Sequence, residues 1–497
     1  MNDIHWHERA KNTVFSVKNL INGKLQDPQG TAVISKYAPN DGRLLYEFAE
    51  GTAADVDQAV AAARESFEDG RWRNKPVYER QAILNKLADL VEENSEQFGL
   101  FECLDVGKPI SAATTDDIGR ATGGLRGAAS GLDNRLLPSG VCGNVMGYQY
   151  RKPIGVVGGI IGWNYPLSLA AGKVGPALAM GNSLVLKPSE FTSLSAVRLA
   201  ELALEAGVPL GVLNVVHGAG LTVGAALASH NDVDMITFTG SSATGKAMMV
   251  AAGQSNMKRV HLECGGKSPY IVFDDCPEDL DWMAQEIVGA AFPNQGALCV
   301  SSTRLVIQAG IKERLMDKIV KETAKISPQD PLDTATTFGA IMNEAHMNKV
   351  LGYVDRGRSD GAQHLYGGEQ VHKETGGFYL TPAIFDNVDP NECIAQEETF
   401  GPLLSTITFT DEAEALTIAN NSIFGLAAFV ATTNLSRAHR VAQNLNAGFI
   451  LTSSIPADAT GIANFGTEPQ RQSGMGFEGG RAGLEAFSVV SAIHMII

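Results

Sequence analysis

Between residues 151 and 252 the chain alternates short apolar runs with amphipathic segments of helical length. After a β-rich stretch at residues 151–161, the apolar runs predict strands at residues 183–187, 212–217 and 235–239. The other segments predict helices at residues 170–179, 193–206, 222–229 and 243–252. Strands that are apolar throughout and separated by helices are typical of a parallel sheet with both faces covered. We therefore expect an α/β fold.

The same alternation restarts after Gly265, so we expect a second α/β unit. It predicts strands at residues 270–273 and 304–307, and helices at residues 280–292 and 312–325. Upstream, residues 53–67 and 78–98 have the periodicity of amphipathic helices. Because 497 residues are too many for one compact core, two or three domains are expected. The active site is expected between the two α/β units.

The net charge, the apolar runs and the spacing of the cysteines exclude several classes of protein. The formal net charge of −16 argues against nucleic acid or an anionic membrane surface as a partner. The longest apolar run, near residues 154–161, is much shorter than a membrane span, and the N-terminus lacks the apolar core of a signal peptide. The six cysteines have no spacing typical of a zinc site. We therefore expect a soluble, cytoplasmic protein in a reducing compartment, with no metal.

Residues 488–497 form a very apolar, strand-like tail, and residues 141–150 predict a hairpin arm. An exposed apolar strand edge is a liability in a monomer, because it invites pairing with another chain. Two outcomes are about equally compatible with the sequence: the tail pairs within its own chain, or it pairs subunits. Together with the arm, the tail favours a homo-oligomer, either a dimer or a tetramer.

Three residues could together carry out covalent chemistry at a carbonyl carbon. Cys299 follows a glycine-containing loop, Glu263 precedes two glycines, and Asn164 lies in a Trp-Asn-Tyr-Pro turn. A thiolate attacks the carbon, an amide donor holds the oxyanion, and a carboxylate manages protons. A free thiol titrates near pH ~8.5, so such a site has to favour the thiolate. Singly, each has a plainer explanation, since most cysteines are inert and buried and most turn glutamates are solvated.

Two glycine clusters could bind a phosphate group. Residues 217–220 with Gly224, and residues 239–245, each follow a predicted strand and open a predicted helix, where free N–H groups favour an anion. The second cluster adds the hydroxyl of Ser241. At the end of another predicted strand, Lys187 and Glu190 could hold ribose hydroxyls. Ordinary βα turns and helix-capping charges are the alternatives.

Seven motifs occur in a fixed order: Trp163-Asn-Tyr-Pro, Lys187-Pro-Ser-Glu, Phe238-Thr-Gly-Ser, Glu263-x-Gly-Gly-Lys-Ser, Asn294-Gln-Gly-x-x-Cys, Glu398-x-Phe-Gly-Pro and Asn421-x-x-x-Gly-Leu-Ala. In this order they resemble the NAD(P)-dependent aldehyde dehydrogenase superfamily, from about Ile21 to the C-terminal tail. The resemblance implies a Rossmann-like NAD(P)-binding domain at residues 1–127 and 151–262 and an α/β catalytic domain at residues 263–463. It also implies an oligomerisation β-arm at residues 128–150, with the tail at residues 464–497.

By this resemblance Cys299 is the nucleophile, Glu263 the general base and Asn164 an oxyanion donor, while Lys173 and Glu478 match a proton-relay pair. The implied reaction oxidises an aldehyde to the acid through a thiohemiacetal and a thioester on Cys299, and Glu263-activated water releases the acid. A CoA-acylating relative is disfavoured because Glu263 is present. The implied cofactor is NAD, with NADP possible, at Ile161, Trp163, Lys187, Ser189, Glu190, Gly220, Gly224, Phe238, Gly240, Ser241, Glu398 and Phe400.

Several positions depart from the family pattern, and they concern the substrate. Ala297 stands where the family usually has Gln, and Gly172 where many members carry a tunnel aromatic. Residues 255–260 look most like aminoaldehyde dehydrogenases that include the γ-glutamyl-aminobutyraldehyde enzymes, which favours an aminoaldehyde substrate. Gly172 suggests a roomier entrance, compatible with a long-chain or aromatic aldehyde instead. An inactive structural homologue is the alternative class. The expected substrate tunnel consists of Tyr165, Gly172, Leu298, Val300 and Phe465.

Overall fold

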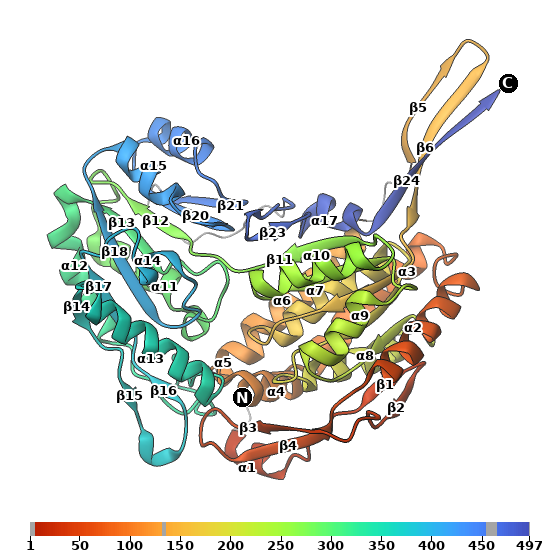
Figure 1. Cartoon of the computed structure of the whole chain (residues 1–497), viewed down its shortest axis with the longest axis horizontal. Helices are drawn as coiled ribbons and strands as arrows, with labels where there is room; N and C mark the ends of the chain where they lie inside the picture. The colour runs from red at the N-terminus through yellow and green to blue at the C-terminus, as the bar shows by residue number, and fades with distance from the viewer. Residues whose placement is uncertain (1–4, 132–135, 454–464, 497) are drawn as a thin grey trace.

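The computed structural model describes residues 5–131, 136–453 and 465–496. Two large sheets with their helices form two lobes, and a narrow β-arm projects from the first lobe (Figure 1). Both sheets have parallel centres, so the predicted α/β class is confirmed. In the described part of the chain, no helix combines the length and apolarity that crossing a membrane requires.

The first sheet has the strand order β2-β1-β9-β8-β7-β10-β11-β23. Its two strands with the predicted bounds, β8 (Ser183–Lys187) and β10 (Met235–Thr239), are almost fully buried. The parallel centre is completed by β7 (Val156–Ile160), β9 (Leu213–Val215) and β11 (Arg259–Glu263). Antiparallel strands β1 (Asn19–Ile21), β2 (Lys24–Gln26) and β23 (Gly474–Met475) complete the edges.

Alternate side chains of these strands enter two separate hydrophobic clusters, which explains why helices are needed on both faces. Val157 and Leu184 pack with α7 (Pro166–Ala179) and α8 (Leu194–Ala206). Val156 and Val185 pack with α2 (Ala53–Glu68) and α10 (Ser242–Gln254). All four helices lie where the sequence predicts them.

Two predicted helices are wrong in detail. The expected helix at residues 78–98 is two helices, α3 (Val77–Glu93) and α4 (Ser95–Val106), because Asn94 leaves the helical conformation at φ −101° and ψ 19°. The expected helix at residues 222–229 begins as a π-helix, Gly220–Gly224, and continues as α9 (Ala225–Ser229). A π-helix has a wider turn than an α-helix. This one contains Gly220 and Gly224, the two glycines that were predicted to contact the cofactor.

The second sheet has the order β14-β17-β18-β13-β12-β20-β21. The predicted strands are β12 (Pro269–Val272) and β13 (Arg304–Gln308), and the predicted helices are α11 (Leu280–Ala291) and α12 (Ala309–Thr323). The other strands are β14 (Gln363–Tyr366), β17 (Ala383–Asp386), β18 (Leu403–Phe409), β20 (Ala427–Ala431) and β21 (Phe449–Ser453), and α13 (Glu344–Ser359), α15 (Glu412–Asn420) and α16 (Leu435–Gln443) pack around them.

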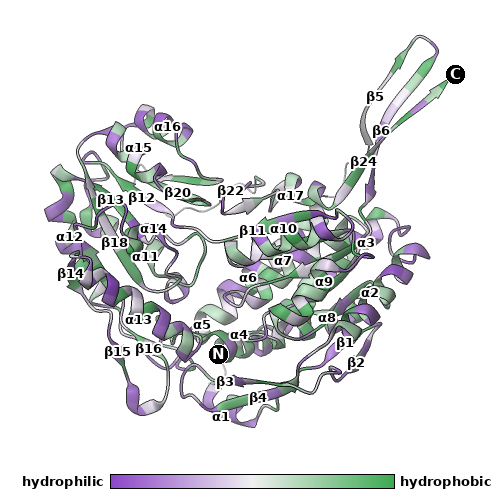
Figure 2. Ribbon diagram, in the orientation of Figure 1, coloured by the Kyte–Doolittle hydropathy of each residue, from purple (hydrophilic) through white to green (hydrophobic). Residues whose placement is uncertain are grey.

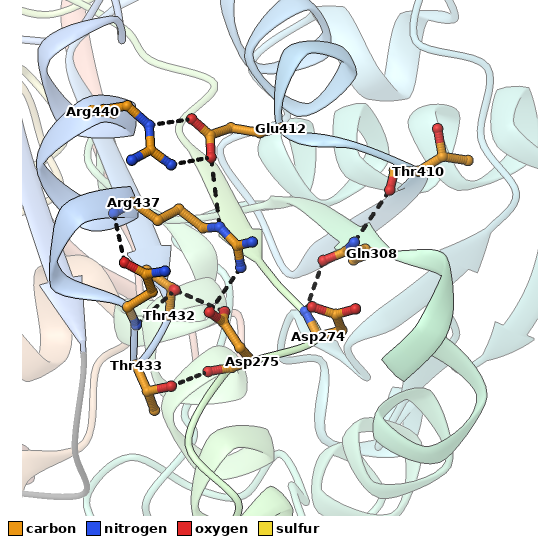
Figure 3. A network of polar contacts seen from close by, with 10 residues as sticks. Asp274, Asp275, Gln308, Thr410, Glu412, Thr432, Thr433, Arg437 and Arg440 are labelled. Atoms are coloured by element: carbon orange, nitrogen blue, oxygen red, sulfur yellow. Dashed lines mark hydrogen bonds and ion pairs between the residues drawn. The ribbon is translucent and has the colours of Figure 1, made fainter.

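A polar network covers the carboxyl ends of β12, β18 and β20 in this sheet (Figure 3). Arg437 on α16 pairs with Asp275 at 2.8 Å, and Arg440 pairs with Glu412 at 2.9 Å. Thr432 donates a hydrogen bond of 2.7 Å to Asp275. Parallel sheets commonly bind ligands at this edge, but here side chains of the same chain occupy it.

The two sheets present opposite edges to the region between the lobes. Glu263 ends β11 and Asn164 follows β7, so both come from the carboxyl edge of the first sheet. Cys299 precedes β13 and Glu398 precedes β18, so both come from the amino edge of the second sheet. These four residues line one cavity.

The projecting arm consists of β5 (Leu136–Cys142), β6 (Val145–Pro153) and β24 (Ser488–Ile496), and its hairpin is longer than the predicted 141–150. β24 pairs with β6 from Ser488 opposite Pro153 to Ile496 opposite Val145. Of the two alternatives for the tail, pairing within the chain is therefore the one observed. Figure 2 shows hydrophobic segments on this arm, outside both lobes.

The predicted division into domains stays a prediction. β23 and α17 (Gly480–Ala486) fall in the range assigned to the tail, yet β23 joins the first sheet and α17 packs against α7. Residues 132–135 and 454–464 of the arm and catalytic ranges lie outside the described residues.

Candidate active site

Cys299 follows a loop with an unusual backbone. Asn294, Gln295 and Gly296 have positive φ angles of 48°, 55° and 75°, a region that residues with side chains adopt only when their surroundings enforce it. A Cβ at position 296 would lie 2.8 Å from the backbone nitrogen of Pro402, so this position requires glycine. The loop is thus held against the second lobe and presents the half-buried thiol to a cavity.

Asn164 lies beside this loop. Its Nδ2 donates a hydrogen bond of 3.1 Å to the carbonyl of Ala297, and Nδ2 of Asn294 donates one of 2.9 Å to the carbonyl of Asn164. These bonds tie the turn after β7 to the loop that carries the thiol. A buried amide N–H is therefore fixed next to the nucleophile, as an oxyanion donor has to be.

Glu263 lies at the end of β11 with its side chain largely buried. Its Oε1 has no hydrogen-bond partner among the described residues. Burial raises the pKa of this carboxyl well above its usual range, the charge of Glu478 raises it further, and Lys173 partly opposes the rise. A carboxyl with a raised pKa is suited to take a proton from water near neutral pH.

The predicted relay pair is close in space although it is distant in sequence. Nζ of the buried Lys173, on α7, lies 3.0 Å from Oε2 of Glu478. Burial alone would raise the pKa of Glu478, but the ion pair with Lys173 holds it below its usual value. The pair therefore places one positive and one negative charge close to Glu263.

The electrostatic environment of Cys299 differs from the sequence-based expectation. Burial raises the pKa of the Cys299 thiol to about 12, and the carboxylates of Glu398, Glu263 and Glu478 act in the same direction. The site was expected to favour the thiolate. Burial therefore disfavours the thiolate, and the three carboxylates add to this effect.

Two adjoining cavities extend from the thiol. One, of about 350 Å³, contains Cys299; the other, of about 470 Å³, lies along α6 (Ile118–Ser130) and α7. They share Arg120, Ser168 and Leu169, so together they form a passage to the thiol. The predicted residues on the first cavity are Trp163, Asn164, Tyr165, Gly240, Ser241, Glu263, Leu298, Cys299, Glu398 and Phe400, and those on the second are Gly172, Lys173 and Glu478.

Two of the predicted tunnel residues lie elsewhere. Val300 and Phe465 line neither cavity, and Phe465 is 80% exposed. The chain turns back toward β13 directly after Cys299, which removes Val300 from the passage. The motif position of Phe465 did not reveal that its side chain faces solvent.

The nicotinamide end of the predicted cofactor site adjoins the thiol. Oε1 of Glu398 accepts a hydrogen bond of 3.0 Å from the backbone N–H of Gly266. A Cβ at Gly265 would lie 2.7 Å from Cδ of Glu398, so glycine lets the carboxylate approach the backbone. Phe400 packs edge-on against Trp163 at a centroid distance of 5.3 Å.

The predicted adenosine end lies further along the same sheet edge. Nζ of Lys187, at the end of β8, donates a hydrogen bond of 2.8 Å to the carbonyl of Pro188. The same atom lies 3.4 Å from Oε2 of Glu190. A Cβ at Gly224 would lie 3.7 Å from Cδ of Lys187, so the π-helix approaches this side chain.

Ser241 caps α10 through Thr244. Of the others, Ile161, Ser189 and Phe238 are buried, and a Cβ at Gly240 would lie 2.5 Å from Cζ of the Phe238 ring.

Sequence reasoning missed several residues of the site, including four with basic side chains. Arg120, His346 and Lys349 line the cavity of Cys299, and His346 pairs with the carbonyl of Phe400 at 2.7 Å. They come from helices that carry no motif, so no sequence signal identified them. His261 had a signal, because it lies two residues before Glu263 on a strand and therefore on the same face.

The geometry defines an enzyme that acts on carbonyl compounds through a covalent thiol intermediate. The sequence model of the aldehyde dehydrogenase family matches residues 26–493. The chain belongs to this family, and the predicted class is confirmed.

Relatives with assigned activities match nearly the whole chain. The NADP/NAD-dependent aldehyde dehydrogenase PuuC of Escherichia coli K12 is 41% identical over 496 residues, 98% of this chain and 97% of that protein. The crystal structure of an indole-3-acetaldehyde dehydrogenase with NAD⁺ has a TM-score of 0.96 at 41% identity and covers 99% of both chains. A γ-glutamyl-γ-aminobutyraldehyde dehydrogenase from Burkholderia cenocepacia J2315 has a TM-score of 0.94 at 42% identity, again over 99% of both chains.

Proposed function

We propose that this aldehyde dehydrogenase forms a thioester on Cys299 and hydrolyses it with water activated by Glu263. The observation that carries the proposal is the convergence of Cys299, Asn164 and Glu263 on one cavity. The sulfur of Cys299 attacks the aldehyde carbon as the thiol proton passes to Glu263 on the same cavity, and the Asn164 amide stabilises the oxyanion of the thiohemiacetal. Loss of hydride from that carbon leaves the thioester. Glu263 then takes a proton from water, whose oxygen attacks the thioester carbon and releases the acid and the thiolate.

The cofactor is NAD, which when bound supplies the hydride acceptor. The residues present fit it: the buried Oγ1 of Thr239 has no partner among the described residues, and Thr239 and Ser241 line the cavity beside the N-terminus of α10. Free N–H groups and the helix dipole at such a terminus favour a pyrophosphate. Glu398 and Phe400 lie on the side of the thiol, where the nicotinamide ribose is expected.

We infer that NAD is preferred to NADP, although NADP can also be used. The ammonium of Lys187 lies 3.4 Å from Glu190, so its charge is already partly neutralised. Glu190 would repel the additional phosphate of NADP. Replacing Glu190 by Gln should raise kcat/KM for NADP relative to NAD, and an unchanged ratio would contradict this assignment.

For the substrate we propose an aminoaldehyde. Two relatives have substrates of different kinds in their names, a γ-glutamyl-aminobutyraldehyde and an indole-acetaldehyde. A long-chain or aromatic aldehyde is therefore the second candidate, and the space left by Gly172 favours it. Arg120 lies where the two cavities meet, and its guanidinium is 5.7 Å from the ring centroid of Tyr165. Its positive charge favours an aminoaldehyde whose nitrogen is acylated over one with a free ammonium group.

Reduction of the nicotinamide, followed by absorbance, tests these proposals with a panel of free aminoaldehydes, acylated aminoaldehydes, and long-chain and aromatic aldehydes. We expect turnover that is lost in the Cys299→Ala variant. If no aldehyde gives a thiol-dependent signal, the alternative that the chain is an inactive structural homologue is correct. In Arg120→Gln, the preference for acylated over free aminoaldehydes should shrink; an unchanged ratio would exclude a role for the charge.

We also propose a cytoplasmic homo-oligomer, a dimer or a tetramer, that associates through the arm. The arm exposes apolar side chains, with Val141 at 66%, Val490 at 45% and Ile496 at 82%. Covering such residues stabilises association. All six cysteines are free thiols, which suits a reducing compartment. Sedimentation and cell fractionation test the two proposals, and a monomer or an exported protein would contradict them.

A further inference from the structure

His261 faces Glu263 across a short gap within the protein. Its Nε2 lies 3.7 Å from Oε1 of Glu263. Both atoms are buried, and neither has a hydrogen-bond partner among the described residues. A buried polar atom without a partner destabilises the folded protein. Two such atoms that face each other indicate a hydrogen bond that forms when Glu263 carries a proton.

The imidazole ring is held so that this nitrogen points toward Glu263. Its Nδ1 lies 2.9 Å from the hydroxyl of Thr237 on the neighbouring strand, and when Nδ1 donates to that hydroxyl, Nε2 is the acceptor. A Cβ at Gly476 would lie 2.5 Å from Cδ2 of the ring, so the backbone closes over it. Phe487 packs edge-on at a centroid distance of 6.4 Å. The orientation of the ring is therefore fixed by packing.

The ring and the base also lie close to a more exposed carboxylate, that of Glu478. Single ligand-type atoms of His261, Glu263 and Glu478 all lie within 4.8 Å of one another. Glu263 lines the cavity of the thiol, whereas His261 and Glu478 line the larger cavity beside it. The side chain of Glu478 is 35% exposed and that of Glu263 only 14%. The buried base, the ring and a group in contact with solvent thus lie together.

We propose that His261 is a positioning residue that holds Glu263 in place while the proton leaves it for Glu478. The proposal rests on the proposed role of Glu263 in thioester hydrolysis. As water attacks, its oxygen bonds to the acyl carbon, its proton goes to Glu263, and the C–S bond breaks with the electron pair on sulfur. The new carboxyl O–H donates to Nε2, which holds the carboxyl in place. The proton then passes from Glu263 to the carboxylate of Glu478, which lies within 4.8 Å, and on to solvent, so that Glu263 is again a carboxylate.

The charges of the site agree with this order of events. Burial lowers the pKa of His261 to about 4, so at neutral pH the ring is an uncharged acceptor. The trio could also hold a metal ion, but Lys173 at 3.0 Å from Glu478 already supplies a positive charge there. A second cation at that position is disfavoured.

Rapid mixing of enzyme, NAD and an aldehyde that the wild type oxidises separates the two chemical steps. In His261→Phe we expect a burst of reduced nicotinamide at nearly the wild-type rate, followed by a steady state about 10- to 100-fold slower. Quenched protein should then carry the acyl group on Cys299, visible by mass spectrometry. In His261→Gln, whose amide reaches the position of Nε2, most of the steady-state rate should return.

His364→Phe is the matched control, because His364 stacks on Phe385 at 4.8 Å in the second lobe and should leave both phases unchanged. Three results would overturn the proposal: an unchanged steady state in His261→Phe, an equal slowing of burst and steady state, or a His261→Gln enzyme as slow as His261→Phe. Loss of wild-type activity on chelation would instead show that the trio binds a metal. Failure of the proposed function is distinct, since the wild type itself would then give no aldehyde-dependent signal.

Discussion

Gly265 controls the position of Glu398, and replacing it by Ala should displace that carboxylate. An added Cβ would lie 2.7 Å from Cδ and 3.0 Å from Oε1 of Glu398. The three nearest atoms all belong to one flexible side chain, so we expect the carboxylate to move and the backbone to stay. The hydrogen bond of 3.0 Å from the N–H of Gly266 is then lost. Such a bond to a charged group is worth about 1.5–3 kcal/mol.

If Glu398 holds the nicotinamide ribose as proposed, this energy appears in cofactor use. We expect kcat/KM for NAD to fall by about 10- to 150-fold in Gly265→Ala, with the aldehyde saturating. Gly253→Ala is the matched control, because a Cβ there meets nothing within 4 Å, and it should leave kcat/KM unchanged.

A double-mutant cycle identifies the cause. In a Glu398→Ala background, Gly265→Ala should add little, since the group it displaces is already gone. Additive losses, or a Gly265→Ala enzyme that uses NAD as the wild type does, would refute the reasoning. Melting temperatures of the four proteins show whether unfolding contributes.

Three further predictions follow from the site and the arm. Asn164→Ala should lower kcat by about 10²- to 10³-fold through loss of an oxyanion donor, and steady-state kinetics at saturating substrate would show a smaller effect if the donor lay elsewhere. Glu263 is active as a carboxylate, so activity falls as the pH drops through its pKa. Glu478 raises that pKa and Lys173 lowers it. The acid limb of the pH profile should therefore move to lower pH in Glu478→Gln and to higher pH in Lys173→Met. Shifts in the same direction would contradict this. Val490→Asp should lower the oligomer mass in sedimentation, and an unchanged mass would show that this face of the arm is not an interface.

The first sheet was predictable because its central strands are buried on both faces. Continuous apolar runs bounded by polar turns mark such strands almost to the residue, as at Ser183–Lys187 and Met235–Thr239. The helix break at Asn94 was not predictable in the same way. Buried apolar residues continue on both sides of it, at Val91 and Phe98, so the periodicity conceals the change of direction.

The pairing of the tail illustrates a different limit. An apolar strand edge requires a partner, but periodicity does not say which one. β24 pairs with β6 along its whole length, and this selects one of two arrangements that the sequence leaves equal. The remaining exposed apolar residues of the arm are a separate surface, which is why pairing within the chain and association of subunits are compatible.

The active site shows where the rule that ligands bind at the carboxyl ends of parallel strands applies and where it fails. Ligand residues at the carboxyl ends of parallel strands were expected, and Glu263 and Lys187 lie there in the first sheet. In the second sheet the rule fails, because Arg437 and its partners fill that edge and Cys299 comes from the opposite one. The motif therefore identified Cys299, and strand topology could not have done so.

His261 shows why the spacing of residues along a strand does not by itself reveal a role. Its position two residues before Glu263 places both side chains on one face, which the sequence alone establishes. That face acquires a function only because the chain returns near its end and brings Glu478 and Gly476 against it. The proposed role of His261 thus depends partly on a local pattern and partly on a long-range contact. A histidine at this spacing should be tested for a role in proton transfer whenever the returning segment brings a carboxylate to the same face.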